Sequence, residues 1–326
     1  MEAKKTRIGT IVKHTGSHYL ISELPLWDLH PVVIRGSLRL KGNATTNPIA
    51  VGDRVEYEMP LDLNSEISGT GSISKILPRK NYIIRKSTNL SRQAHIIAAN
   101  IDLAYLVVTL DFPETKWPFI DRFLVTCQAY NVPVKILLNK IDLYGESHRE
   151  LINYFKEVYH DQAGYDIIEI SATKGINIQK IKEECARKND DGQVNISLFS
   201  GVSGVGKSSL IRALDPSIQL KTNNISSYHI QGKHTTTFYE MYKLETGGFI
   251  IDTPGIRGFG LIDVEKEEIS TYFPEMFHIM DKCRFQPCTH THEPGCAVKQ
   301  AVENGEISYE RYKSYLGMLD DETKYR

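Results

Sequence analysis

The chain has 326 residues, of which 41% are hydrophobic and 24% are charged, and its formal net charge is −1. This composition is typical of a folded globular protein and excludes a mainly disordered, collagen-like or disulfide-dense chain. The length suggests two or three domains. No apolar run of about 18 residues occurs, and the charged N-terminus has no signal-peptide core, so we expect a cytoplasmic protein without a membrane span.

Short apolar runs separated by turn sequences occupy the first eighty or so residues. They predict strands over residues 7–12, 18–21, 32–38 and 54–59. Several short strands at close spacing indicate a small barrel or sandwich. The basic stretch 73–87 contains Pro78, which disfavours a helix interior, and is predicted to be a connector. Residues 1–90 hold 13 Lys and Arg against 8 Asp and Glu, a weak indication of a polyanionic partner.

From about residue 95 the pattern changes to buried strands alternating with helices. Strands are predicted over residues 101–110, 134–138, 167–170 and 194–199, and helices over 119–130, 149–158, 176–186 and 208–214. This alternation predicts an α/β domain with a mostly parallel sheet. Runs 237–244 and 248–251 flank Thr246-Gly247 and predict a hairpin. After about residue 265 the chain is predicted to be helical around one cysteine-containing stretch, with a helix over 307–319.

A phosphate-binding loop follows the fourth predicted α/β strand. It reads Gly201, Val202, Ser203, Gly204, Val205, Gly206, Lys207 and Ser208, and fits G-x-x-x-x-G-K-[ST]. Its glycines allow the backbone N–H groups to approach phosphates, and the helix N-terminus favours negative charge. Lys207 is expected to reach the β- and γ-phosphates, and the Ser208 hydroxyl to ligate Mg²⁺; we include Ser209, the next residue, in the nucleotide site.

Asp252-Thr253-Pro254-Gly255 follows another buried run. An acid at the end of such a strand is where P-loop enzymes hold Mg²⁺, directly or through water. Asp252 is therefore a candidate magnesium ligand, and the Gly255 N–H a candidate γ-phosphate donor. The tetrapeptide alone is a common turn sequence and gains its meaning from the P-loop.

Two further loops carry residues suited to reading guanine. In Asn139-Lys140-Ile141-Asp142, the Asp142 carboxylate can accept two hydrogen bonds from guanine, whereas adenine would leave it unpaired. Asn139 would contact the base edge and the Lys140 stem would cover the ring. In the stretch beginning Ser171-Ala172, the Ala172 N–H could bond guanine O6 while Ser171 braces the loop.

Together these four elements look like the G1, G3, G4 and G5 motifs of a translation-factor-type GTPase, but in the order G4, G5, G1, G3. This order resembles a circularly permuted GTPase. The pocket needs the loops together in space, so their order along the chain is free once the old termini are joined.

Residues 232–237, Gly-Lys-His-Thr-Thr-Thr, lie between G1 and G3, where a threonine can serve as a second Mg²⁺ ligand in the GTP state. Thr235, Thr236 and Thr237 all remain open, with Thr236 favoured. Ile256 follows the G3 glycine and cannot orient water as a glutamine would. Slow intrinsic hydrolysis is therefore expected. His234 is the nearest substitute, and the alternative is that it is a structural loop histidine.

The only dense group of cysteines lies near the C-terminus, in the spacing Cys283-x4-Cys288-x-His290-x5-Cys296. Three thiolates and an imidazole suit a closed tetrahedral Zn²⁺ site. His292 competes with His290 as the fourth ligand. Cys127 and Cys185 occur in helical patterns and are predicted to pack in the core.

The combination of a β-barrel, a permuted GTPase and a Cys₃His segment resembles the small-ribosomal-subunit-dependent GTPase A (RsgA) family over nearly the whole chain. The Gly-Lys-His-Thr-Thr-Thr stretch and the cysteine spacing are its specific features. The resemblance implies an OB-fold-like RNA-binding domain over residues 1–80, a GTPase domain over 81–265 and a zinc-binding domain over 266–326.

The resemblance also implies a monomeric GTPase, using Mg²⁺ with GTP and one Zn²⁺ per chain. Its turnover would be stimulated by the 30S subunit, and it would contact 16S rRNA during late maturation. Two alternatives stay open. One is a permuted GTPase that acts on another RNA or on the large subunit. The other is an RNA-binding zinc protein in which GTP is structural.

Overall fold

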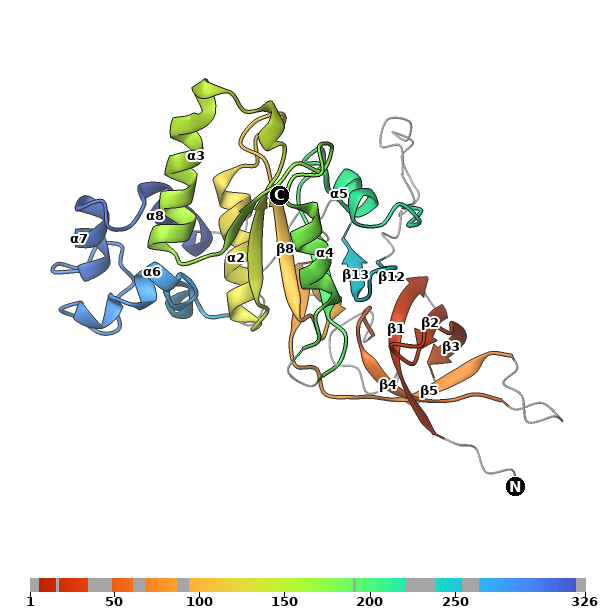
Figure 1. The fold of residues 1–326 in the computed structure, drawn as a ribbon. Helices are drawn as coiled ribbons and strands as arrows, with labels where there is room; N and C mark the ends of the chain where they lie inside the picture. Colours follow the sequence, from red (N-terminus) through yellow and green to blue (C-terminus); the bar gives the residue numbers. More distant parts are fainter. Residues whose placement is uncertain are drawn as a thin grey trace, which may run out of the picture.

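The computed structural model describes residues 6–15, 18–34, 49–60, 69–86, 94–189, 192–220, 239–253 and 264–320. Figure 1 shows a β-barrel at one end, an α/β body in the middle and a group of short helices at the other end. The strands predicted at 7–12, 18–21 and 54–59 are confirmed, and the one at 32–38 begins earlier and is described only as far as Ile34.

The N-terminal barrel closes through five strands. They are β1 (Arg7–Thr15), β2 (His18–Ser22), β3 (His30–Ile34), β4 (Arg54–Glu58) and β5 (Gly71–Ile76). β1 pairs antiparallel with both β2 and β4, and β3 pairs parallel with β5, so the ring is complete. Alternate side chains point inward and form a core that includes Ile11, Val55, Tyr57 and Ile73. The expected OB-like barrel is confirmed.

The predicted connector over residues 73–87 is wrong. It contains the end of β5 and all of β6 (Tyr82–Lys86), which forms a hairpin with β7 (Ala94–Ala99). Pro78 lies between β5 and β6, where it interrupts neither strand. β5 pairs with β4 through a register shift, so the fully buried Ile73 and the exposed Lys75, two residues apart, do not follow a simple alternation. The buried isoleucines Ile73, Ile83 and Ile84, rather than net charge, were the informative signal.

The central sheet has the strand order β10-β9-β8-β11-β13-β12. Its strands are β8 (Leu103–Val108), β9 (Val134–Leu138), β10 (Ile167–Glu169), β11 (Ile196–Ser200), β12 (Glu240–Lys243) and β13 (Phe249–Asp252). All pair in parallel except β12, which forms the predicted hairpin with β13. The predicted α/β domain is confirmed.

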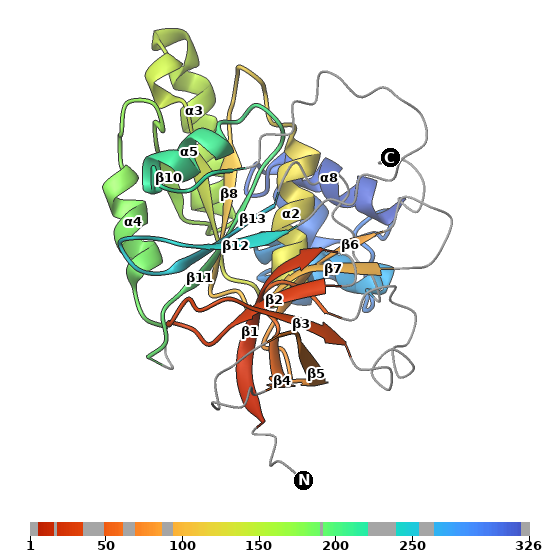
Figure 2. The same ribbon diagram turned by 90° about the vertical axis from the view of Figure 1, so that its right-hand side faces the viewer.

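Helices cover both faces of this sheet (Figure 2). α2 (Trp117–Ala129) and α3 (Arg149–Lys156), which continues as a π-helical turn over Glu157–Gln162, pack in one core. α4 (Ile178–Ala186) and α5 (Lys207–Leu214) pack in the other. Cys127 and Cys185 are both fully buried, one in each core, as predicted.

The C-terminal segment consists of short helices packed on α2. It comprises the 3₁₀ turns η4 (Lys266–Tyr272) and η5 (Met280–Lys282) and the helices α6 (Pro274–Phe277), α7 (Ala297–Glu303) and α8 (Tyr309–Leu319). Buried Arg311 of α8 pairs with Asp121 of α2 and Glu275 of α6, which fastens this segment to the α/β body. In the described part of the chain, every helix is too short or too polar to cross a membrane.

Candidate functional site: a nucleotide pocket and a metal centre

The four candidate loops all begin where a parallel strand ends. β11 leads into the P-loop, β13 ends at Asp252, β9 leads into Asn139 and β10 leads toward Ser171. Carboxyl ends of parallel strands meet at one edge of a sheet, which is where open α/β folds bind ligands. The permuted chain order therefore does not scatter the motifs, because the strands, and not the connections, place them.

Glycine is required at two P-loop positions. A Cβ on Gly206 would lie 2.5 Å from the Asn139 amide nitrogen, and the φ of +90° there disfavours other residues. A Cβ on Gly201 would lie 2.6 Å from the Val107 carbonyl oxygen of β8. The loop is thus packed against both the neighbouring strand and the Asn139 loop, and only glycine fits at these two close approaches of the backbone.

Lys207 and Asp252 form an ion pair at the floor of the site. Lys207 is the first residue of α5, and its side chain is only 9% exposed; Asp252 is the last residue of β13, and its side chain is 15% exposed. The lysine thus neutralises the carboxylate predicted to face Mg²⁺. Ser208 and Ser209 in the first turn of α5 are exposed, so the Ser208 hydroxyl is accessible to a ligand. These residues fit a phosphate-bound Mg²⁺.

The Asn139 amide holds three loops together. Its Nδ2 donates to the Val205 carbonyl at 2.8 Å, and its Oδ1 accepts from the Ala172 N–H at 3.2 Å. The residue is 1% exposed, so both bonds are shielded from water. Asn139 therefore braces the P-loop against the Ser171 loop, a role that the sequence prediction of a base contact did not include. The base contact itself stays a prediction.

Lys140 and the loop after β8 close the other side of the P-loop. The Lys140 ammonium donates to the carbonyl oxygen of Gly204 at 2.7 Å and also to that of Phe112. The Lys140 stem consequently lies along the pocket, as required for covering a base. Phe112 was not singled out from the sequence, and no motif marks it.

Asp142 is oriented by two hydroxyl groups. Ser171 donates to Oδ1 at 2.5 Å, and Thr173 donates to Oδ2 at 3.4 Å. The hydrogen bond from Ser171 lowers the pKa of Asp142, so this exposed carboxylate is ionised and ready to accept hydrogen bonds. Ser171 itself is fully buried, and it also accepts a bond from the Lys174 N–H at 3.1 Å, so its hydroxyl links both sides of this loop.

Several predicted site residues lie outside the described residues. These are His234, Thr235, Thr236, Thr237, Gly255 and Ile256. Their proposed roles in catalysis and magnesium binding stay predictions from sequence.

The cysteine cluster forms a compact set of four potential ligands. The ligand atoms of Cys283, Cys288, His290 and Cys296 all lie within 4.8 Å of one another. His290 Nδ1 lies 3.6 Å from the Cys283 sulfur and 3.3 Å from the Cys296 sulfur, and these two sulfurs are 3.9 Å apart. Tetrahedral zinc with bonds of about 2.0–2.3 Å gives ligand separations of about 3.5–3.8 Å. The residues therefore fit Zn²⁺.

The structure separates the two candidate histidines. His290 is fully buried with Nδ1 facing the sulfurs, whereas the exposed His292 bonds Thr291 through its Nδ1. Burial raises the pKa of the Cys288 thiol to about 12, and the neighbouring sulfurs add to this effect. A cation at this position would counter the shift and hold the sulfurs as thiolates.

The support for the cluster includes residues that the sequence did not reveal. Glu293 accepts N–H bonds from Thr289 at 2.7 Å and from Thr291 at 3.0 Å, which fixes the turn that carries His290. Burial opposes ionisation of Glu293, but the hydrogen bonds from Thr289 outweigh it, and its pKa lies below the ordinary value. The Tyr312 hydroxyl of α8 donates to the His290 carbonyl at 2.6 Å, which joins the cluster to the last helix.

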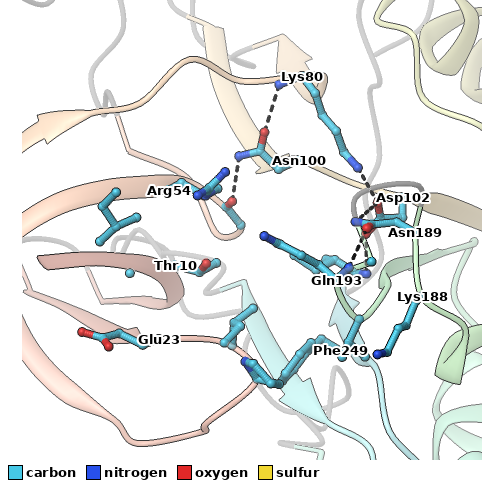
Figure 3. Close-up of a pocket in the computed structure, with 18 of the residues that line it drawn as sticks. Thr10, Glu23, Arg54, Lys80, Asn100, Asp102, Lys188, Asn189, Gln193 and Phe249 are labelled. Carbon is cyan, nitrogen blue, oxygen red and sulfur yellow. Dashed lines mark hydrogen bonds and ion pairs between the residues drawn. The ribbon is translucent and has the colours of Figure 1, made fainter.

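A second cleft, of about 640 Å³, lies at the opposite edge of the central sheet (Figure 3). Arg54 and Thr10 of the barrel form one wall, and Lys188 and Gln193 near α4 form another. Phe249, which also lines it, is the first residue of β13, so the cleft is at the amino ends of the strands. The cleft is therefore separate from the nucleotide pocket.

Comparisons with known proteins agree with this geometry. A model of the RsgA GTPase family matches residues 76–262. The chain is 51% identical over 320 residues to a Bacteroides fragilis protein named small ribosomal subunit biogenesis GTPase RsgA, covering 98% of each. A protein of the same name from Flavobacterium psychrophilum is 49% identical over 317 residues, 97% of this chain and 94% of the relative.

Two solved structures resemble the whole chain. YjeQ from Thermotoga maritima has a TM-score of 0.74 and 33% identity, covering 97% of this chain and 98% of that one. YloQ, described as a circularly permuted GTPase, has a TM-score of 0.67 and 28% identity, covering 98% and 96%. The likeness therefore includes the barrel and the C-terminal helices as well as the α/β body.

Proposed function

The chain belongs to the RsgA GTPase family and is a circularly permuted GTPase, and from this premise we propose that it acts on the small ribosomal subunit. It binds the 30S particle through 16S rRNA late in maturation, hydrolyses GTP to GDP and phosphate under stimulation by that particle, and then leaves. We assign RNA binding to residues 1–80, GTP hydrolysis to 81–265 and zinc binding to 266–326.

The observation that carries the enzymatic part is the buried Asn139 bridge between the P-loop and the Ser171 loop. It holds the phosphate-binding wall and the guanine-reading loop in one rigid unit. Asp142 accepts from guanine, Ala172 donates to O6, and Lys140 lies over the ring. Adenine would leave the ionised Asp142 without donors, which costs affinity.

At the phosphate end, Lys207 turns from Asp252 to the β- and γ-phosphates. Ser208, Asp252 and Thr236 would hold Mg²⁺, and the ion would supply positive charge to stabilise the transferred phosphoryl group. Replacing Lys207 by Mg²⁺ beside Asp252 would be favourable, because this carboxylate then has a cationic neighbour both before and after nucleotide binding. Gly255 donates to the γ-phosphate.

Water activation is the incomplete step. Ile256 has no polar atom to orient water, so His234 supplies that function once its loop is ordered by the ribosomal particle. External completion of such a site accelerates phosphoryl transfer by about 10³–10⁵-fold. Hydrolysis then releases the switch segments and lowers the affinity for RNA.

Co-sedimentation with purified particles tests the choice of partner. In low salt, the protein with a non-hydrolysable GTP analogue should pellet with 30S, and the GDP form should bind more weakly. Phosphate contacts should make the binding fall steeply as salt rises. Preferential binding to 50S would favour the large-subunit alternative, and binding that is the same in both nucleotide states would favour structural GTP.

A further inference from the structure

A row of four charged side chains runs from the barrel to the P-loop. Lys13 of β1 lies opposite Glu240 of β12, and Glu240 lies opposite Asp252 of β13. The Lys13 ammonium pairs with the Glu240 carboxylate at 2.5 Å, and Asp252 pairs with Lys207. The order across three strands and the start of α5 is thus lysine, acid, acid, lysine, with the two acids adjacent.

The two acids face the same side of the sheet. Residues directly opposite each other in an antiparallel pair point to one face, and like charges there destabilise the pair. Tyr242, two residues after Glu240, is influenced by the charge of both acids. Burial is the main cause that raises the pKa of its hydroxyl, and the carboxylates of Glu240 and Asp252 raise it further. Each acid is offset by its own lysine.

The two lysines differ in what nucleotide binding does to them. Under the proposed function, on which this inference rests, Lys207 turns to the phosphates. Lys13 stays paired with Glu240. Of the two lysines in this row, it is then the one that offsets the facing acids without contacting nucleotide. Its side chain is 19% exposed and that of Glu240 is 24% exposed, so water screens this pair only partly.

We propose that Glu240 is a positioning residue that couples the RNA-binding barrel to the nucleotide site through its ion pair with Lys13. The pair fastens β12 to β1, and β12 sets Asp252 through its hairpin with β13. A particle that orients the barrel therefore acts on the position of Asp252, and by linkage the nucleotide state changes how the barrel is held.

The test compares Glu240→Gln and Lys13→Met, singly and together, with Lys13→Arg as the conservative variant. Lys75→Met and Glu56→Gln are matched controls, since they remove another lysine–glutamate pair of the barrel, at 3.4 Å and away from β12. For each protein, the stimulated kcat, the unstimulated rate and the 30S concentration at half-stimulation are measured.

Each single variant should lower the ratio of stimulated to unstimulated kcat by about 5-fold or more, a typical size for coupling between sites. The double variant should lose no more than the singles, Lys13→Arg should restore the ratio, and the controls should leave it within about 2-fold. A loss of RNA affinity alone would instead raise the half-stimulating concentration for Lys13→Met, and Glu240→Gln, which removes an acid, would not share it. A wild-type ratio in both single variants would overturn the coupling while leaving the proposed function intact.

Hydrogen exchange without ribosomes decides the coupling independently. In the wild type, amides of β1 should exchange more slowly with a GTP analogue than with GDP, and this difference should vanish in Glu240→Gln. The absence of any difference in the wild type would overturn the inference. If β1 shows this exchange difference but 30S does not stimulate hydrolysis, the inference stands and the proposed partner is rejected.

Discussion

Replacing Arg311 with methionine should detach the C-terminal helices from α2. The guanidinium is 1% exposed and donates to Glu275 at 2.7 and 2.9 Å and to Asp121 at 2.8 Å. Arg311→Met keeps much of the apolar bulk but leaves two buried carboxylates unpaired. Breaking a buried pair in this way costs about 3–5 kcal/mol.

The loss should depend on pH in a defined direction. Burial raises the pKa of Asp121, and Arg311 opposes that rise. In Arg311→Met the opposition is gone, so the folded state binds protons more tightly than the unfolded state does. Its stability should therefore increase as the pH falls through the raised pKa, and the deficit relative to wild type should be smaller at pH 5 than at pH 8.

Native-state hydrogen exchange of α8 measures this local opening directly. We expect the opening free energy to fall by about 3 kcal/mol or more at pH 8. Arg311→Met with Asp121→Asn and Glu275→Gln should recover part of it, because the uncompensated charges are removed. An opening free energy within about 1 kcal/mol of wild type at pH 8 would refute the electrostatic account.

Three further changes test single roles. Asp142→Asn should weaken GTP binding and create binding of xanthosine triphosphate, whose C2 carbonyl suits the new amide donor; titration with both nucleotides checks this, and unchanged GTP affinity would remove Asp142 from guanine reading. Cys288→Ser should lower the zinc content seen by elemental analysis and destabilise the C-terminal helices while GDP binding persists; zinc-free wild-type protein purified without chelator would contradict the metal assignment. His234→Ala should lose most of the 30S-stimulated rate and keep GTP affinity within a few-fold, whereas equal stimulation of both proteins would exclude His234 from water activation.

The α/β body was predictable because its signals are local and redundant. Continuous apolar runs mark buried parallel strands, and the glycines of the P-loop are required by contacts such as that of Gly206 with Asn139. The hairpin of β12 and β13 was marked by Thr246-Gly247 between two apolar runs. The apolar runs, the P-loop motif and the turn are each short, contiguous stretches of sequence, so they could be recognised without knowing their distant contacts.

The features that sequence did not reveal depend on distant partners. The Asn139 amide bonds groups 33 and 66 residues away, and Arg311 bonds Asp121 at a separation of 190 residues. β5 and β6 were missed because each pairs with its neighbour through a register shift, which interrupts the alternation expected of a half-buried strand. The choice between His290 and His292 required burial, which residue spacing alone does not give.

The central claim is that GTP turnover is completed by the small ribosomal subunit, and turnover measured against added 30S, 50S and 70S particles tests it most directly. The account predicts slow hydrolysis by the protein alone, strong stimulation by 30S at low salt, and loss of that stimulation as salt rises. Hydrolysis that is equally fast with and without 30S at low salt, or that responds only to 50S, would contradict it.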